Sequence, residues 1–288
     1  MFETITKYTQ HYVRLSNGCN VAYIDEGKGD KTLLFVHGLA TYAQTWAFNI
    51  EALKDRYRCI AIDLPGNGYS DGGDYPYGIN FYSGCVYDFM LQLGLDNVVP
   101  VGHSMGGHVL LNLVINHPTV CKEMILCAPA GFETYSHIER TIYSASIHFL
   151  DMFSTEENSL RQILKASFMN YPSKMDGMVQ ELVDLMNKQP MVQYRKMIEA
   201  CIMGMMEEPV FDQLKTIQQR VLVIFGERDA LIPNNKLHFM STRNLAERGV
   251  AQIPHARLEM LPRCGHFLQL EKPEQTNKLM QEFLEATS

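Results

Sequence analysis

The sequence lacks the features that tie a protein to membranes or nucleic acids. Its 288 residues contain no apolar run long enough to cross a bilayer. The first residues, MFETITKYTQHYVRL, contain no apolar signal-peptide core, so we expect a cytoplasmic protein. The formal net charge is −7, which offers no attraction to a phosphate backbone or an anionic lipid surface. We therefore expect neither nucleic acid nor membrane as a partner.

The sequence also has little that would bind metal or form disulfides. Its seven cysteines are odd in number and include no C-x-x-C pair, which favours reduced, buried thiols. His255 is followed by no second ligand at metal spacing, so we expect no metal and no cofactor. Repeats and low-complexity tracts are absent, and nothing in the sequence indicates an oligomeric state.

What the sequence does contain is an alternation of strand-like and helix-like segments. The predicted strands are Gln10–Ser16, Cys19–Asp25, Thr32–His37, Cys59–Asp63, Val98–Val101, Met124–Ala128, Val221–Phe225 and Ala256–Leu261. The predicted helices are Thr41–Leu53, Phe81–Leu93, Met105–Asn116, Asn235–Glu247 and Pro273–Ala286. Apolar strands without polar alternation must be covered on both faces. The pattern therefore predicts an α/β fold with a doubly wound, mostly parallel sheet, preceded by a hairpin that turns at Asn17-Gly18.

Residues 131–211 interrupt this alternation with a pattern that is helical throughout. Ten of the 17 methionines fall in this segment, including Met203, Met205 and Met206. We expect a helical cap subdomain over 131–211, inserted into a core formed by 1–130 and 212–288. The methionines are either ordinary helix packing or a deformable apolar wall over a pocket. In the second case Met203, Met205, Met206 and Phe267 line that pocket.

Three polar residues follow three different predicted strands. The stretch VGHSMGGH places Ser104 between a strand and a helix, among glycines, where a sharp turn exposes its hydroxyl. Asp229 follows the strand VLVIF, and His266 follows the next strand. Ligands in such sheets bind beyond the carboxyl ends of the strands. Because a serine nucleophile needs a base, and the base an orienting acid, this placement predicts a Ser-His-Asp constellation.

These motifs together resemble the α/β-hydrolase family over nearly the whole chain. The similar blocks are FVHGLATYAQTW, DLPGNGYSD, GHSMGG, GERDALIP and RCGHFLQLEKP. The resemblance implies that Ser104 is the nucleophile, His266 the general base and then acid, and Asp229 the orienting carboxylate. It also implies an oxyanion hole formed by the backbone N–H groups of Leu39 and Met105.

Some residues have structural alternatives. Asp229 could cap a following helix, His266 could be a packed loop residue, and Ser104 an inert turn residue. Other polar residues near the motifs are expected to be structural: His37, His103, His108 and Asp63. Pro100 departs from the family pattern, because a central strand normally uses every N–H, and it predicts a local gap in strand pairing.

The serine excludes the family's dehalogenases and epoxide hydrolases, which use aspartate at this turn. An acyl-enzyme route remains, and we expect a small or medium hydrophobic ester, thioester or lactone as the small-molecule acyl substrate. Carbon–carbon bond hydrolysis of ring-fission products is an alternative, although that group has an H-G-x-G-P loop and a tryptophan after the histidine, where this chain has HGLATY and Phe267. A slow-turnover ligand receptor on the same fold is a further alternative.

Overall fold

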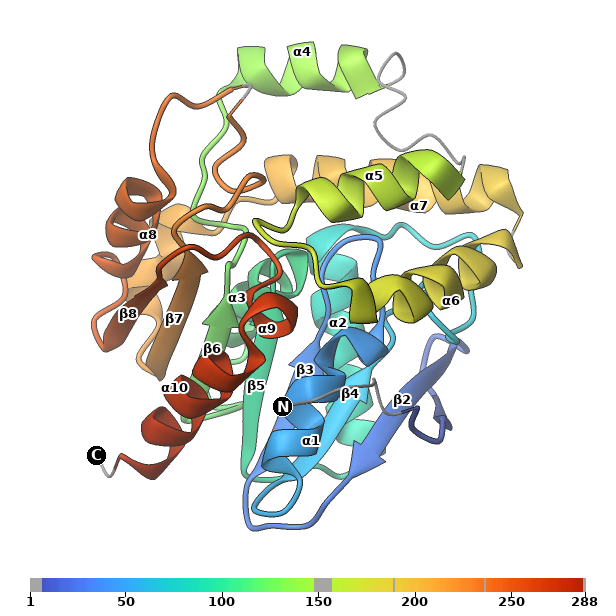
Figure 1. Cartoon of the computed structure of the whole chain (residues 1–288), viewed down its shortest axis with the longest axis vertical. Coiled ribbons are helices and arrows are strands. Elements are labelled where there is room, and N and C mark those ends of the chain that lie inside the picture. The colour runs from blue at the N-terminus through green and yellow to red at the C-terminus, as the bar shows by residue number, and fades with distance from the viewer. Residues whose placement is uncertain (1–6, 148–156, 189, 236, 287–288) are drawn as a thin grey trace.

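The computed structural model describes residues 7–147, 157–188, 190–235 and 237–286, with side chains for all of these but 143–147 and 157–160. The described chain forms one eight-stranded sheet in the order β1-β2-β4-β3-β5-β6-β7-β8 (Figure 1). The strands are β1 (His11–Arg14), β2 (Asn20–Glu26), β3 (Thr32–Val36), β4 (Arg58–Ile62), β5 (Val98–His103), β6 (Glu123–Cys127), β7 (Arg220–Gly226) and β8 (Ala256–Leu261). The first two strands pair antiparallel as the predicted hairpin, and β3 to β8 are parallel. The predicted fold class is thereby confirmed.

Helices cover both faces of the sheet, as continuous apolar strands require. Every residue of β3 and β5 is buried. Helices α1 and α10 lie on one face, and α2 and α3 on the other (Figure 1). The helices are α1 (Ala47–Leu53), α2 (Gly78–Gln92), α3 (Met105–Asn116), α4 (His137–Ile147), α5 (Glu157–Ala166), α6 (Asp176–Asn187), α7 (Met191–Glu207), α8 (Thr242–Val250), α9 (Leu268–Glu271) and α10 (Pro273–Glu285).

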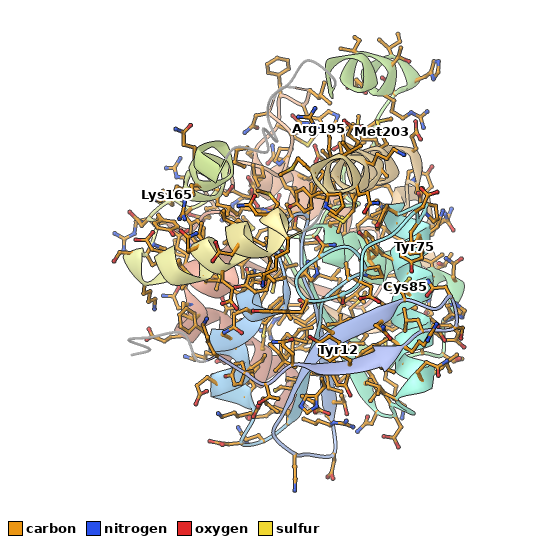
Figure 2. The ribbon with its side chains drawn as sticks, turned by 90° about the vertical axis from the view of Figure 1, so that its right-hand side faces the viewer. Tyr12, Tyr75, Cys85, Lys165, Arg195 and Met203 are labelled. Carbon is orange, nitrogen blue, oxygen red and sulfur yellow. The ribbon has the colours of Figure 1, made fainter. Side chains whose placement is uncertain are left out.

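Helices α4 to α7 lie between β6 and β7 in the chain and form a layer beyond one end of the sheet (Figure 1). Figure 2 shows Lys165 of α5 and Met203 of α7 in this layer. The layer is tied to the core by hydrogen bonds: the Tyr42 hydroxyl donates to the Met178 carbonyl at 3.3 Å, and the Tyr69 hydroxyl donates to Glu181. In the described part of 131–211 the chain is helix and loop without a strand, as predicted.

The strand order reverses direction beside β5. The chain goes from β3 outward to β4 and then returns to place β5 on the other side of β3. Val36 of β3 is level with Gly102 of β5, and His103 is level with Cys127 of β6. The loops after these strands therefore meet at one edge. Such a switch point is where open α/β sheets bind ligands.

Two predicted elements differ from the structure. The helix predicted at Asn235–Glu247 begins only at Thr242, because Ser241 caps it by accepting the Asn244 N–H at 3.2 Å. Residues 235 and 237–241 are not helical, and Lys236 lies outside the described residues. Pro100 does lie inside β5, level with Leu34. However, the ladder between β5 and β6 starts at Val101, so the residue without an N–H precedes that ladder.

Candidate active site

Ser104 lies on a strained turn between β5 and α3. Its backbone has φ 52° and ψ −119°, a conformation that costs a non-glycine residue on the order of 1–3 kcal/mol. Hydrogen bonds hold it there: Ser104 N–H donates to the Cys127 carbonyl, and Ala130 N–H donates to the Ser104 carbonyl, both at 3.0 Å. A Cβ on Gly106 would lie 2.4 Å from the Val36 carbonyl oxygen, so only glycine fits behind the turn. The turn therefore presents the Ser104 side chain beyond the sheet.

Asp229 and His266 form a buried pair in the loops after β7 and β8. His266 Nδ1 lies 2.8 Å from Asp229 Oδ2, and the two side chains are 2% and 0% exposed. The other carboxylate oxygen, Oδ1, accepts the N–H groups of Leu231 and Ile232 at 2.8 and 2.9 Å. An ionised carboxylate only accepts hydrogen bonds, so opposite such a group this contact favours the imidazole tautomer with its hydrogen on Nδ1 and a lone pair on Nε2.

The His266 loop is fastened to the segment that follows α5. His266 N–H donates to the Ser167 carbonyl at 2.9 Å. Glu271 Oε2 accepts the N–H groups of Gly265 and Met169 at 2.9 and 3.1 Å, and its Oε1 accepts that of Asn170 at 3.1 Å. One carboxylate therefore joins the histidine loop to the helical layer. Sequence reasoning missed this residue, because nothing local to Glu271 indicates a partner 102 residues away.

The loop after β3 lies directly against the Ser104 turn. A Cβ on Gly38 would be 3.1 Å from Ser104 Cβ and 3.0 Å from His103 Nδ1. Leu39, the next residue, lines the same cavity as Ser104. On the other side Met105 begins α3, and the first N–H groups of a helix have no partner within it. Both N–H groups predicted to bind an oxyanion thus belong to segments that flank Ser104.

His37 and Asp63 fix these loops, as we expected. His37 Nδ1 is 2.7 Å from the Gly38 carbonyl, and its Nε2 accepts the Leu64 N–H at 3.0 Å. Complete burial lowers the pKa of His37 to about 4, so the ring is neutral when it accepts this bond. Asp63 accepts the N–H groups of Ala43 and Tyr69 at 2.6 and 2.8 Å, while burial raises its pKa to about 7.

The two histidines that flank Ser104 are buried and make structural contacts. His103 Nε2 is 3.1 Å from the His266 carbonyl oxygen, and its ring packs 4.7 Å from the His266 ring. Burial, together with the neighbouring His266, holds the pKa of His103 well below the usual range for histidine. His108 Nε2 is 3.1 Å from the Glu208 carbonyl, at the end of α7, and burial lowers its pKa to about 4.

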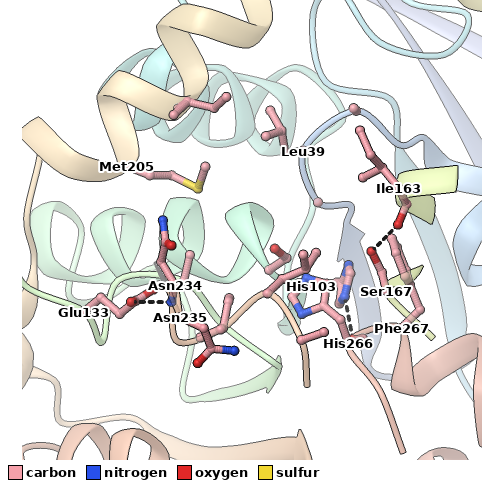
Figure 3. Close-up of a pocket in the computed structure, with 18 of the residues that line it drawn as sticks. Leu39, His103, Glu133, Ile163, Ser167, Met205, Asn234, Asn235, His266 and Phe267 are labelled. Atoms are coloured by element: carbon pink, nitrogen blue, oxygen red, sulfur yellow. Dashed lines mark hydrogen bonds between the residues drawn. The ribbon is translucent and has the colours of Figure 1, made fainter. Parts of the chain in front are cut away.

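A cavity of about 480 Å³ separates the loops of the sheet from the helical layer, and both Ser104 and His266 line it. Figure 3 shows His266 among the lining residues. Of the predicted pocket residues, Met205, Met206 and Phe267 line this cavity. Met203 does not, and that part of the prediction is wrong. Residues three and four apart share one face of a helix, so α7 presents Ile202, Met205 and Met206 to the cavity and turns Met203 away.

Sequence reasoning missed several residues of the cavity wall. From the helical layer these are Ile163, Leu164 and Ser167, and from the loops after β6 and β7 they are Glu133, Tyr135, Asn234 and Asn235. Residues of these types are common in loops and helices, so the sequence gives no sign that they line a cavity. Only the packing of the inserted helices onto the sheet brings them to one cavity.

The described residues hold no group of three or more His, Cys, Asp or Glu side chains arranged for a metal ion. Within the same part of the chain, no helix combines the length and hydropathy needed to traverse a bilayer.

Comparison with known proteins identifies the family of this chain. A family model described as the alpha/beta hydrolase fold matches residues 31–273. The chain belongs to the α/β-hydrolase family. One similar protein is the dihydrolipoyllysine-residue acetyltransferase component of the acetoin cleaving system of Cupriavidus necator, with 28% identity over 93% of this chain and 67% of that protein.

Two further matches span almost the whole chain. The 2-hydroxy-6-oxononadienedioate/2-hydroxy-6-oxononatrienedioate hydrolase of Paraburkholderia phymatum is 27% identical over 99% of both proteins. The crystal structure of a probable hydrolytic enzyme from Pseudomonas aeruginosa superposes with a TM-score of 0.83, at 24% identity, over 99% of this chain and 96% of that one. The structural match supports the fold, including the helical insertion.

Proposed function

We propose that this α/β-hydrolase is a serine hydrolase that cleaves small or medium hydrophobic carboxylic esters, or the related thioesters and lactones, through an acyl-enzyme. The observation that carries the proposal is the buried Asp229–His266 hydrogen bond of 2.8 Å beside a strained serine that opens on the same cavity. A carboxylate that only accepts hydrogen bonds, an imidazole and a hydroxyl are the parts of a nucleophilic triad.

In the first half of the reaction Ser104 Oγ attacks the ester carbonyl while His266 Nε2 takes the hydroxyl proton. Asp229 keeps the Nδ1–H tautomer in place and stabilises the imidazolium that forms. The N–H groups of Leu39 and Met105 stabilise the negative oxygen of the tetrahedral intermediate. His266 then gives its proton to the leaving alcohol.

The second half returns the enzyme to its starting state. A water molecule attacks the acyl group on Ser104 as His266 takes a proton from it. The tetrahedral intermediate collapses, the carboxylic acid leaves, and the proton on Nε2 returns to Ser104. The complete reaction uses only the residues of this chain, the ester and water.

The size and lining of the cavity support a substrate of limited length. A volume of about 480 Å³ holds on the order of 15 water-sized groups, which suits a short or medium acyl chain with its alcohol. Apolar side chains, among them Ile202, Met205 and Phe267, form much of the wall. Each methylene that they remove from water contributes roughly 0.8 kcal/mol, up to the point where the cavity ends.

A second candidate is carbon–carbon bond hydrolysis, and the resemblance to the Paraburkholderia phymatum hydrolase favours it. The substrate in that protein's name is a dioate, which carries two carboxylates. Among the described residues that line the cavity there is no Lys or Arg to pair with a carboxylate. We therefore rank ester hydrolysis first.

A panel of p-nitrophenyl esters from acetate to dodecanoate, measured beside a ring-fission dienone, tests the ranking. We expect many turnovers on butyrate and hexanoate, and slower turnover of the dienone. Cleavage of the dienone with kcat/KM above that of every ester would instead favour the carbon–carbon reaction. A single turnover that then stalls would favour a ligand receptor.

A further inference from the structure

One side of the cavity contains a carboxylate that the proposed reaction does not use. Glu133, in the loop after β6, is only 8% exposed and lines the cavity. Its Oε1 accepts the Asn234 N–H at 2.8 Å and lies 2.6 Å from His238 Nδ1. Two donors on one oxygen fix the orientation of the carboxylate within the wall.

The second oxygen, Oε2, has no hydrogen-bond partner in the part of the chain that the structure describes. A ligand that displaces solvent from this side of the cavity leaves such an oxygen without a donor, which typically costs 1–3 kcal/mol or more. The loss is avoided when the ligand itself supplies a donor. Since Glu133 belongs to the cavity wall, a substrate in that cavity is the molecule placed to do so.

The surroundings of Glu133 favour a donor over an anion. His238 packs 5.2 Å from the Tyr135 ring, and its Nε2 is 3.5 Å from Glu139 Oε1, so the imidazole lies between two carboxylates. Asn235 adds a polar amide to the same wall. No described lining residue is a lysine or arginine. A carboxylate on the substrate would thus face Glu133 without a compensating charge.

The opposite side of the cavity is mainly apolar, and its Ser167 hydroxyl already donates to the Ile163 carbonyl at 2.7 Å. Figure 3 shows Glu133, Asn234 and Asn235 on one side, Ile163 and Phe267 on the other, and His266 between them. Phe267 stacks on Phe168 with ring centroids 5.0 Å apart, which gives this side a rigid aromatic surface. The reacting carbonyl, held near His266, would place the two halves of an ester on chemically different walls.

We propose that Glu133 is a specificity-determining residue, and that its free oxygen accepts a hydrogen bond from a hydroxyl or ammonium group on the substrate. The substrate class is then an amphiphilic ester, with an apolar group toward Phe267 and a donor toward Glu133. This inference rests on the proposed hydrolase activity and specifies its substrate.

Two series of esters test the inference, since either half of the ester can face Glu133. One series carries p-nitrophenol as the alcohol and six-carbon acyl groups whose far ends are methyl, hydroxyl, ammonium or carboxylate. The other consists of hexanoates of four-carbon alcohols with the same ends. In one of the two series we expect hydroxyl or ammonium to exceed methyl by about 10- to 100-fold in kcat/KM, the range of a hydrogen bond to a charged group. Carboxylate should fall below methyl.

The variant Glu133→Gln replaces the free oxygen with an NH2 donor. It should remove the preference in kcat/KM for the donor-ended ester over the methyl-ended one. Glu259→Gln makes the same charge change outside the cavity wall and should keep the preference. An unchanged preference in Glu133→Gln would overturn the proposal. If this variant does not fold, the ranking in the parent decides, because a parent that prefers methyl or carboxylate in both series contradicts the proposal.

Two outcomes separate the failure of this inference from the failure of the proposed function. A parent that cleaves none of the esters refutes the hydrolase activity itself. A parent that cleaves methyl-ended esters readily, but prefers carboxylate ends, refutes only the donor site.

Discussion

Replacing Asp229 with asparagine should inactivate the enzyme through the tautomer of His266. The Asp229 oxygen Oδ1 accepts two backbone N–H groups, at 2.8 and 2.9 Å, from Leu231 and Ile232. An amide NH2 cannot replace it there, so the asparagine oxygen must take this position. The NH2 group then faces His266 Nδ1, where it donates a hydrogen bond and forces the hydrogen onto Nε2.

An imidazole with its hydrogen on Nε2 cannot accept the Ser104 proton. The expected loss in kcat is on the order of 10⁴, as for the same change in serine proteases, or about 5.5 kcal/mol of activation free energy. Because both backbone N–H groups remain paired, the melting temperature should stay near that of the parent.

Hydrolysis of p-nitrophenyl butyrate at pH 7.5 measures this effect. Asp96→Asn, at an exposed position, makes the same chemical change and should leave kcat unaltered. If Asp229→Asn retains more than about a tenth of the parent kcat, Asp229 does not orient the base, and the reasoning from its hydrogen bonds is refuted.

Three further predictions follow from the same contacts. Glu271→Gln must lose one or more of the three hydrogen bonds from backbone N–H groups, so urea unfolding should show a free energy of unfolding lower by about 1–3 kcal/mol. In steady-state kinetics the variant should reduce kcat more than it changes KM. His37 and His108 have pKa values lowered to about 4 in the folded state, so below pH 6.5 they bind protons in the unfolded chain but not in the folded one. Each should therefore lower the free energy of unfolding by up to about 3 kcal/mol as the pH falls to 4. Asp63, with its pKa raised to about 7, has the opposite effect, so stability should fall more steeply from pH 6.5 to 4 in Asp63→Asn than in the parent; equal slopes would contradict this assignment. Activity should rise from acetate to hexanoate and fall by dodecanoate, with a shorter optimum in Met206→Phe; a profile still rising at dodecanoate would mean that the cavity does not limit the chain.

The sheet and the three polar residues could be predicted because their signals are local. Continuous apolar runs as short as Thr32–Val36 favour strands that are covered on both faces. Ser104 directly follows one strand, and Asp229 and His266 lie in the loops after two others, and the carboxyl ends of parallel strands meet at one edge.

The cavity wall could not be predicted, because long-range contacts decide it. The loop before α8 is held by Glu133, 101 residues earlier, which accepts the Asn234 N–H, and this segment looked helical in the sequence. Likewise the methionine run gives no sign of which face of α7 meets the sheet, so Met203 was placed in the wall where Ile202 lies.

The most direct test of the account is to capture the acyl group on the enzyme. The parent is mixed with p-nitrophenyl butyrate, quenched in acid within the first turnovers, and analysed by intact mass and peptide mapping. We predict a butyryl group on Ser104, and neither this group nor ester turnover in Ser104→Ala. Turnover without an acylated Ser104, or Ser104→Ala activity within about tenfold of the parent, would contradict the proposed mechanism.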